Sequence, residues 1–216
     1  MSDVDEITSK FLALIGFREG SAQHALLLDA TEYFITRRNI EFISDFSSLS
    51  TQRAVIMAFS FGLRPNDDPG ATNIALAAII NKILDDKPGF PVFAQWEIAD
   101  ALRVQGRIED FRAVRKEGYL STRGVLDQFC QEFKCLDMNV ESVILVAHPD
   151  HIFRCKRLIE KRDLNVTVPR YCLKPPDPWQ SFGCDDWGYD PMSTQYWTTN
   201  RSRFILHELS SVLRTL

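Results

Sequence analysis

Residues 142–168 read SVILVAHPDHIFRCKRLIEKRDLNVTV, and this stretch decides the fold. It begins with an apolar run at 142–147, which is typical of a strand buried on both faces of a parallel sheet. Pro149 suits the first turn of a helix, which we expect to run to Arg162. A second strand is predicted at 165–168. Strand, helix and strand form a βαβ crossover, the unit from which parallel sheets are built.

Strands and helices alternate in the same way upstream of this unit. Apolar runs predict strands at 54–60, 91–95 and 111–114. Apolar residues at helical spacing predict helices between them, at 72–85, at 97–104 and after a cap at Ser121 or Thr122. The predicted fold class is therefore α/β, a Rossmann-like three-layer sandwich with a mostly parallel sheet.

The two ends of the chain are predicted to be helical. Helical spacing appears over 2–15 and 21–37, a short helical piece is expected at 41–46, and a final helix starts at Thr199 or Asn200. Because the opening helices precede any strand, we interpret residues 1–50 as an N-terminal helical cap. Residues 51–216 then form the Rossmann-like α/β domain, one compact unit.

Composition excludes several classes of protein. The net charge of −4 disfavours a nucleic-acid partner, which usually requires a basic face. The sequence contains no run of about 18 apolar residues, which is the length that a membrane-spanning helix needs. The five cysteines are an odd number with no Cys-x-x-Cys pair, so free thiols in a reducing compartment are expected. These features favour a soluble, cytoplasmic protein and leave its oligomeric state open. The small-molecule partner that we expect is inferred from the strand-end residues described next.

The richest candidate site follows the strand at 142–147. Open parallel sheets bind ligands outside the carboxyl ends of their strands. His148 ends the strand, and His151 and Arg154 lie three residues apart on one helix face. A helix N-terminus favours an anion, which the Arg154 fork would also bind, and His151 could hold or move a proton. Alternatively, Pro149 and Asp150 simply cap the helix.

Other strand ends supply further candidates. Ser60, Gly62 and Arg64 follow the first predicted strand and could bind phosphate, although a plain turn explains them equally well. Glu97 could bind a ribose or act as a base, or it could only complement a helix dipole. Thr122 is interpreted as a helix cap with side access to the site.

No metal site is expected. The spacing of His148 and His151 permits chelation only if both are helical, and no third ligand is adjacent. Trp179, Trp187 and Trp197 could form a lid over a pocket or cover a sheet edge, and the second alternative is preferred.

A resemblance to a known family rests on the same region. The strand Val143-Ile144-Leu145-Val146-Ala147, followed by His151-Ile152-Phe153-Arg154-Cys155, resembles the YdcF-like family. Val166-Thr167-Val168-Pro169 takes the place of the family's next strand. The chain departs from the family at Ala94-Gln95-Trp96-Glu97, where members have Ser-Gly-Gly, and at Val125, where they have Asn.

The resemblance implies a Rossmann-like sheet with a pocket at the strand ends. The cofactor is unknown from the residues, and the resemblance alone suggests S-adenosylmethionine. We expect a YdcF-like small-molecule-binding protein, with an enzyme acting on a nucleotide-like or anionic ligand as the first hypothesis. His151 and Glu97 would then be catalytic. The predicted ligand-binding residues are Ser60, Gly62, Arg64, Thr122, His148, Asp150 and Arg154.

Two alternatives remain open at this point. A non-catalytic sensor or interaction module could retain the fold without the chemistry. A phosphoryl- or glycosyl-handling enzyme could use the same pocket together with a metal.

Overall fold

The structure is a computed structural model that describes residues 21–37, 39–107, 111–114, 120–173 and 188–214. The helix predicted at 2–15 lies outside the described residues, as do Trp179 and Trp187. All other predicted helices and strands fall, wholly or in large part, within them.

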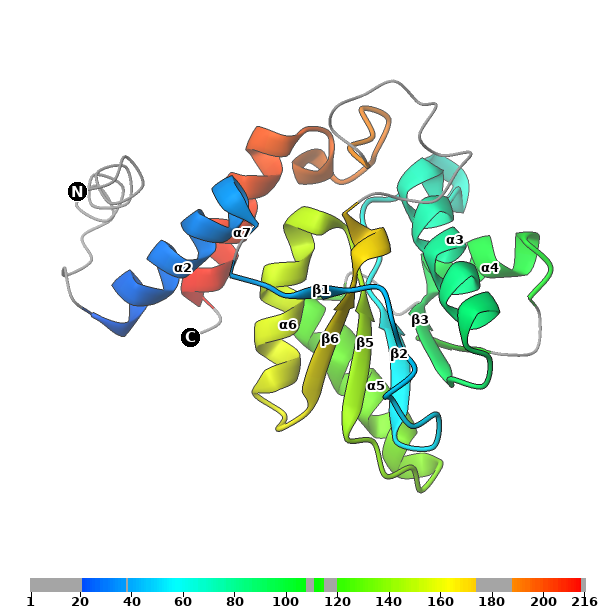
Figure 1. Cartoon of the computed structure of the whole chain (residues 1–216). Coiled ribbons are helices and arrows are strands. Elements are labelled where there is room, and N and C mark those ends of the chain that lie inside the picture. Colours follow the sequence, from blue (N-terminus) through cyan, green and yellow to red (C-terminus); the bar gives the residue numbers. More distant parts are fainter. Residues whose placement is uncertain (1–20, 38, 108–110, 115–119, 174–187, 215–216) are drawn as a thin grey trace.

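A parallel sheet forms the centre of the molecule (Figure 1). Its strands lie in the order β1-β6-β5-β2-β3-β4, and each neighbouring pair is parallel. The chain builds outward from β2 to β3 and β4, and then crosses back to β5 and β6 on the other side. The strand bounds are β1 Phe42–Ile43, β2 Ala54–Ala58, β3 Val92–Gln95, β4 Phe111–Val114, β5 Ser142–Val146 and β6 Asn165–Pro169.

Helices cover both faces of the sheet and complete the three layers. Right-handed crossovers place α3 and α4 on one face, and the reversal of direction after β4 places α5 and α6 on the other (Figure 1). The predicted α/β class is thereby confirmed. The helix bounds are α2 Ala22–Thr36, α3 Gly70–Asp86, α4 Trp96–Val104, α5 Thr122–Cys135, α6 Ile152–Glu160 and α7 Arg201–Arg214. Across the described ranges, no helix has the length and apolar character needed to cross a membrane.

The local sequence explains these elements. All five residues of β2 are buried, as the continuous apolar run predicts for a central strand. Ser21 and Ser121 cap α2 and α5, because each hydroxyl accepts the backbone N–H three residues ahead, at 3.2 Å. The 3₁₀ turn Pro149–His151 precedes α6, so the helix predicted from Pro149 begins in regular form only at Ile152.

The helical piece predicted at 41–46 is wrong. Phe42 and Ile43 form β1 instead and pair in parallel with Val168 and Pro169 of β6. Both are strand-forming residues, and the open edge of β6 offers them backbone partners. Part of the segment assigned to the N-terminal cap therefore belongs to the sheet.

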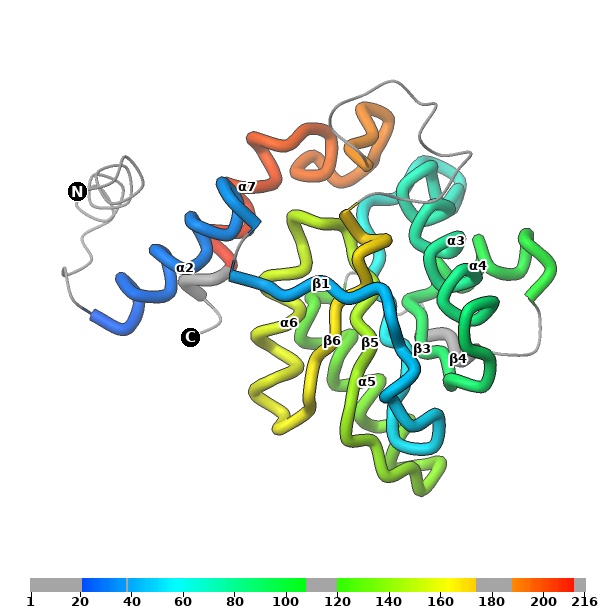
Figure 2. Tube along the Cα trace, in the orientation of Figure 1, coloured from blue at the N-terminus to red at the C-terminus, as the bar shows by residue number. Residues whose placement is uncertain are grey.

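Helices from the two ends of the chain pack together. Helix α2 and helix α7 lie side by side beyond α6 (Figure 2). Between the sheet and α7, residues 188–200 lie over the carboxyl ends of the strands and include the turn Tyr196–Thr198. We call residues 188–200 the cover segment. The sheet's carboxyl edge is therefore enclosed by elements that are distant in sequence.

Candidate functional site

A small cavity lies at the carboxyl edge of the sheet, between the ends of β2 and β5. This is the point where the strand order reverses, the usual ligand site of an open α/β sheet. Its volume is about 50 Å³, enough for a few water molecules or one small polar group. Four parts of the chain line it. They are the ends of β2 and β3, with Ser60, Phe61, Gly62 and Gln95; α5 and the residues before it, with Leu120, Thr122 and Val125; the start of α6 and the turn before it, with Arg154 and His151; and the C-terminal region, with Gln195, Trp197, Thr198, Phe204 and His207.

A buried carboxylate from α7 organises this cavity. Glu208 is fully buried, and its Oε1 lies 3.2 Å from Nδ1 of His151. Arg154 donates from Nε to both Glu208 oxygens, at 3.0 and 2.9 Å, and from Nη2 to Oε1 at 2.6 Å. This paired arrangement is the strong form of an arginine–carboxylate contact. Glu208 therefore joins α7 to both predicted site residues, His151 just before α6 and Arg154 within it.

The charges of this group follow from burial and pairing. Burial alone would raise the pKa of Glu208, but the charges and hydrogen bonds of Arg154 and His151 together outweigh it and lower the pKa from 4.5 to about 2. Burial lowers the pKa of His151 below 6.5, and the nearby charge of Arg154 adds to this, against the opposing pull of Glu208. Near neutral pH, Glu208 is therefore ionised and His151 is neutral.

The contacts of Nδ1 bear on which nitrogen of His151 carries the proton. Nδ1 of His151 lies 3.2 Å from Oε1 of Glu208, which can only accept, and 3.3 Å from Nη2 of Arg154, which can only donate. We assign the proton to Nδ1, which then donates to the ionised Glu208, because Arg154 already has Glu208 as its acceptor. The other nitrogen, Nε2, then presents its lone pair to the cavity, 3.4 Å from the Thr122 hydroxyl. A neutral imidazole oriented in this way can accept a proton from a hydroxyl or a water molecule. Thr122, His151 and Glu208 thus form a hydroxyl–imidazole–carboxylate series.

The backbone donors expected to bind an anion are already used. His148 accepts all three at the start of α6: its carbonyl bonds the N–H of His151 at 2.8 Å and of Ile152 at 3.1 Å, and its Nδ1 accepts the N–H of Asp150 at 3.2 Å. The His148 ring stacks on Phe61, with centroids 3.8 Å apart. Arg154 is likewise paired with Glu208. The anion site predicted at this terminus has its donors satisfied within the fold.

Asp150 serves as an internal anchor. It is 2% exposed and accepts hydrogen bonds from Arg37 of α2, from Arg201 Nε of α7 at 3.2 Å, and from the Tyr189 hydroxyl. Arg201 also donates to the carbonyl of Phe34 at 2.7 Å. The carboxylate therefore fastens both end helices to the turn that carries His151, and it does not line the cavity.

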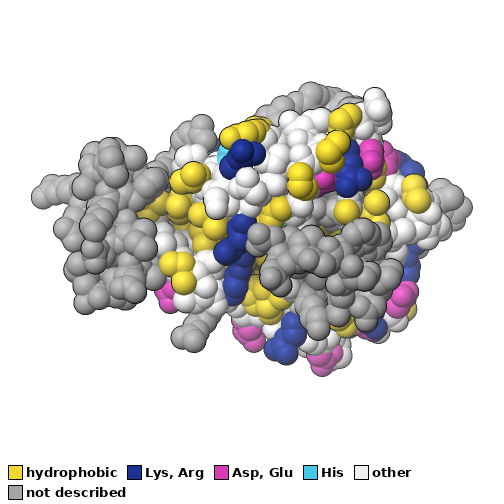
Figure 3. All heavy atoms as spheres, turned by 90° about the horizontal axis from the view of Figure 1, so that it is seen from above, with side chains coloured by type: hydrophobic (Ala, Val, Ile, Leu, Met, Phe, Trp, Pro, Cys, Tyr) yellow, Lys and Arg dark blue, Asp and Glu magenta, His cyan; other side chains and the backbone are white. Residues whose placement is uncertain are grey.

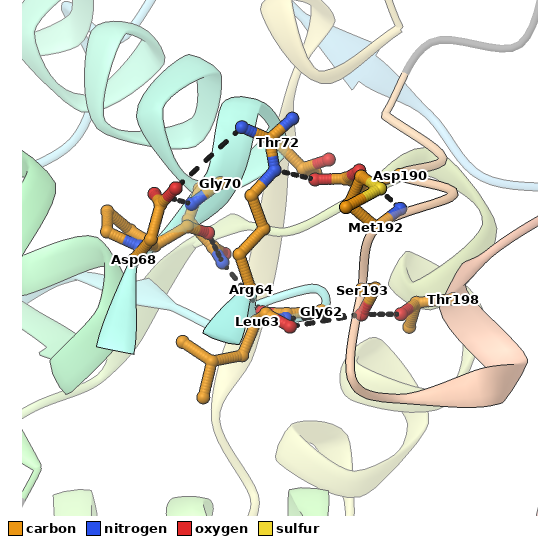
Figure 4. Close-up of polar contacts among 12 residues, drawn as sticks. Gly62, Leu63, Arg64, Asp68, Gly70, Thr72, Asp190, Met192, Ser193 and Thr198 are labelled. Atoms are coloured by element: carbon orange, nitrogen blue, oxygen red, sulfur yellow. Dashed lines mark hydrogen bonds and ion pairs between the residues drawn. The ribbon is translucent and has the colours of Figure 1, made fainter. Parts of the chain in front are cut away.

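The predicted phosphate loop lies under the cover segment (Figure 4). Arg64 Nε bonds Asp190 at 2.5 Å, and Leu63 accepts the N–H of Thr194 at 2.8 Å. Gly62 has φ +75°, and a side chain there would come within 3.0 Å of the Ser193 and Thr198 hydroxyls. Gly62 still lines the cavity, as does Ser60, whereas Arg64 points to the cover segment.

Glu97 is not brought to the cavity. It is buried in the first turn of α4, but the residue of this region that lines the cavity is Gln95. The reason lies in where β3 ends: Gln95 is its last residue, at the sheet edge, and Glu97 is already in the helix. The acid beside His151 is Glu208, so the structure does not bring the two residues predicted as catalytic, His151 and Glu97, together at the cavity.

Sequence reasoning missed Glu208, Gln195 and His207. A signal existed for Glu208, because it lies four positions after Phe204 on the buried stripe of the final helix. An acid in an apolar stripe indicates a paired or functional carboxylate. Trp197, proposed as a lid or an edge cover, lines the cavity and stacks on His207 with centroids 4.8 Å apart.

The surface above this edge hides the central histidines. His148 and His151 are 1% and 6% exposed. Figure 3 looks down on this end of the molecule, and where described atoms form the surface only a small area of histidine side chain is visible. A ligand reaching His151 therefore has to enter through the small cavity or displace the cover segment.

Comparisons of the chain with protein-family models, curated proteins and solved structures found no match.

Proposed function

We propose that this protein is an enzyme that acts on a small molecule at the carboxyl edge of its sheet, with His151 as the general base. The observation that carries this is the 3.2 Å contact of His151 Nδ1 with the buried Glu208. With the proton assigned to Nδ1, the lone pair of Nε2 faces the cavity. A base needs its proton acceptor aimed at the reacting group and a pKa suited to neutral pH. His151 has the geometry, and its lowered pKa keeps it in the basic form.

The reaction class follows from what Nε2 faces. Thr122 is 3.4 Å away, at the first position of α5. In one route His151 takes the proton of the Thr122 hydroxyl, whose oxygen bonds to the substrate as the bond to the leaving group breaks, and His151 passes the proton to that group. Water or an acceptor hydroxyl, deprotonated by His151, then displaces Thr122 and completes the turnover. In the other, His151 takes the proton of a substrate hydroxyl or of water, and Thr122 only positions it. Both routes lead to hydrolysis or group transfer.

The likeness to the YdcF-like family remains a proposal, and with it S-adenosylmethionine as a ligand. A molecule of that size exceeds a cavity of about 50 Å³, so its binding would require the cover segment to move. The support for an anionic ligand is weaker, because Arg154 and the backbone donors at the start of α6 have internal partners.

A non-catalytic sensor or interaction module is the second candidate. Its support is that the contacts of Arg154 and Asp150 also hold α6, α2 and α7 together, which is a purely structural use. In this case the protein binds a ligand without turning it over.

The test is a turnover screen of the full chain against small esters, phosphoesters and glycosides. We expect His151→Asn to lose 10²-fold to 10⁴-fold of any activity found, the usual contribution of a general base. Thr122→Val separates the two routes, because it abolishes only the covalent one. His24→Asn, on α2 and not lining the cavity, is the matched control. Activity that survives in His151→Asn would contradict the proposal.

A further inference from the structure

The charges at the cavity are already balanced. The described residues that line it include no lysine, aspartate or glutamate, and one arginine, Arg154. Arg154 is paired with Glu208 through both carboxylate oxygens, so the two side chains together carry no net charge. An anionic ligand would have to compete with a buried carboxylate for this arginine, at the cost of leaving that carboxylate unpaired.

Neutral hydrogen-bonding groups at the cavity are, by contrast, available. Gln95 Oε1 accepts the backbone N–H of Ser60 at 3.0 Å, which fixes the amide and leaves its NH₂ group to donate elsewhere. Within the described ranges, the Ser60 hydroxyl and the Gln195 side-chain amide make no hydrogen bond to the protein. All three side chains are half-buried and line the cavity. Partly desolvated polar groups of this kind gain from a ligand that supplies their partners.

Aromatic rings complete the lining. Trp197 lies on one part of the wall with its ring held parallel to His207, and Phe204 lies on another, packed against Phe61 with centroids 4.6 Å apart. Rigid rings beside amides and hydroxyls suit a ligand with both C–H faces and hydroxyl groups.

We propose that the cavity binds the hydroxylated, uncharged end of a polyol or an unphosphorylated sugar. Gln95, Gln195 and Ser60 offer partners for the ligand's hydroxyls, and the hydroxyl that reacts faces Nε2 of His151. A whole sugar ring exceeds about 50 Å³, so its binding, like that of any larger ligand, also requires the cover segment to move. This inference rests on the proposed function for the role of His151, and it adds the class of substrate to it.

The test measures binding apart from turnover, by saturation-transfer NMR on the full chain. The neutral probes are glycerol, myo-inositol and methyl β-glucopyranoside, and the charged probes are glucose 6-phosphate and adenosine monophosphate at equal ionic strength. We expect signal transfer to at least one neutral probe, and weaker or no transfer to the charged ones. Gln95→Glu keeps the oxygen that accepts from Ser60 and loses the NH₂ donor, so neutral binding should weaken about tenfold or more.

Two further variants serve as the control and as a second test of the amide contacts. Gln52→Glu is the same substitution at an exposed site and should leave binding unchanged. Gln195→Met removes the second amide without touching the sheet, in case Gln95→Glu does not fold. Binding of no neutral probe, tighter binding of the charged probes, or neutral binding unaffected by both glutamine variants would each overturn the inference. Neutral binding without turnover dependent on His151 would refute only the proposed catalysis.

Discussion

Glu208 and His151 lie 3.2 Å apart between side-chain atoms although 57 positions separate them in the chain. Helix α7 makes this contact possible by returning to the carboxyl edge after the chain has completed the sheet. The same carboxylate binds Arg154. Glu208 is therefore the acceptor to which we assign the Nδ1 proton of His151, and it also neutralises Arg154, which is the one lysine or arginine side chain among the described residues of the cavity.

Removal of Glu208 should destabilise the fold strongly. Glu208→Ala leaves the guanidinium of Arg154, which is 12% exposed, without its carboxylate. We expect a loss of roughly 3 to 5 kcal/mol of unfolding free energy, the usual cost of breaking a buried ion pair. Urea denaturation measures it. Glu160→Gln, which removes an exposed carboxylate paired with Lys156 on α6, should change stability by less than about 1 kcal/mol. Equal effects of the two variants would count against the buried pair.

Stability should fall as the solution becomes acidic, in two stages. The pKa of His151 is lowered by folding, so the unfolded chain binds its proton first. The stabilisation that comes from neutral His151 is fully present above pH 6.5, the ordinary pKa of histidine. It is lost as the pH drops below 6.5 toward the lower pKa of His151 in the folded protein. In His151→Asn, urea denaturation at several pH values should show a smaller loss over this range. An unchanged pH profile in the variant would show that His151 keeps its ordinary pKa.

The second stage belongs to Glu208. Its folded pKa is about 2, against an ordinary value of 4.5, so its stabilisation is present above pH 4.5 and is lost as the pH falls toward 2. Glu208→Gln should remove this stage. His151→Asn should keep the part of this stage that comes from Arg154 and lose the part that comes from His151, so the stage should become smaller.

Asp150 should control the docking of the two end helices. Asp150→Asn leaves Arg37 and Arg201 close together without the carboxylate between them, and we expect a loss of roughly 3 kcal/mol. Hydrogen exchange should rise in α2 and α7 before it rises in the central strands. Asp29→Asn, at an exposed α2 carboxylate paired with Arg157, is the control and should cost less than about 1 kcal/mol. Uniform exchange throughout the protein would argue against a local anchor.

Gly188 should tolerate no side chain. A Cβ there would lie 2.6 Å from Cδ2 of His148, whose ring is held against Phe61. Gly106→Ala is the matched control, since φ is +88° at Gly106 and +89° at Gly188 but nothing lies within 4 Å of a Cβ at Gly106. We expect Gly106→Ala to cost about 1 kcal/mol through backbone strain alone. Gly188→Ala should cost roughly 1 to 3 kcal/mol more through overpacking, and equal thermal shifts would refute this contact.

Sequence reasoning predicted the sheet well because apolar periodicity and turn residues are local signals. The continuous apolar runs of β2 and β5 and the caps at Ser21 and Ser121 all lie within a few residues of what they determine. The strand β1 was missed because its formation depends on the free edge of β6, more than 120 positions away.

The candidate site was predicted only in part, for a similar reason. His151, Arg154, Thr122, Ser60 and Gly62 follow strands or start helices, and the rule for open parallel sheets places them at one edge, where they line the cavity. Glu208, Gln195 and His207 come from a region with no strand to place it. The partner of Arg154 therefore could not be assigned from the sequence, and its charge was assigned to a ligand.

The most direct test of the central claim is the protonation state of the His151 ring nitrogens, observed by long-range ¹H–¹⁵N correlation NMR on histidine-labelled protein near pH 7. Assignment comes from the signal lost in His151→Asn. The account requires a neutral ring with the proton on Nδ1, directed at Glu208, and a change of this pattern in Glu208→Gln. A charged ring, or a proton on Nε2, would contradict it, because no lone pair would then face the cavity.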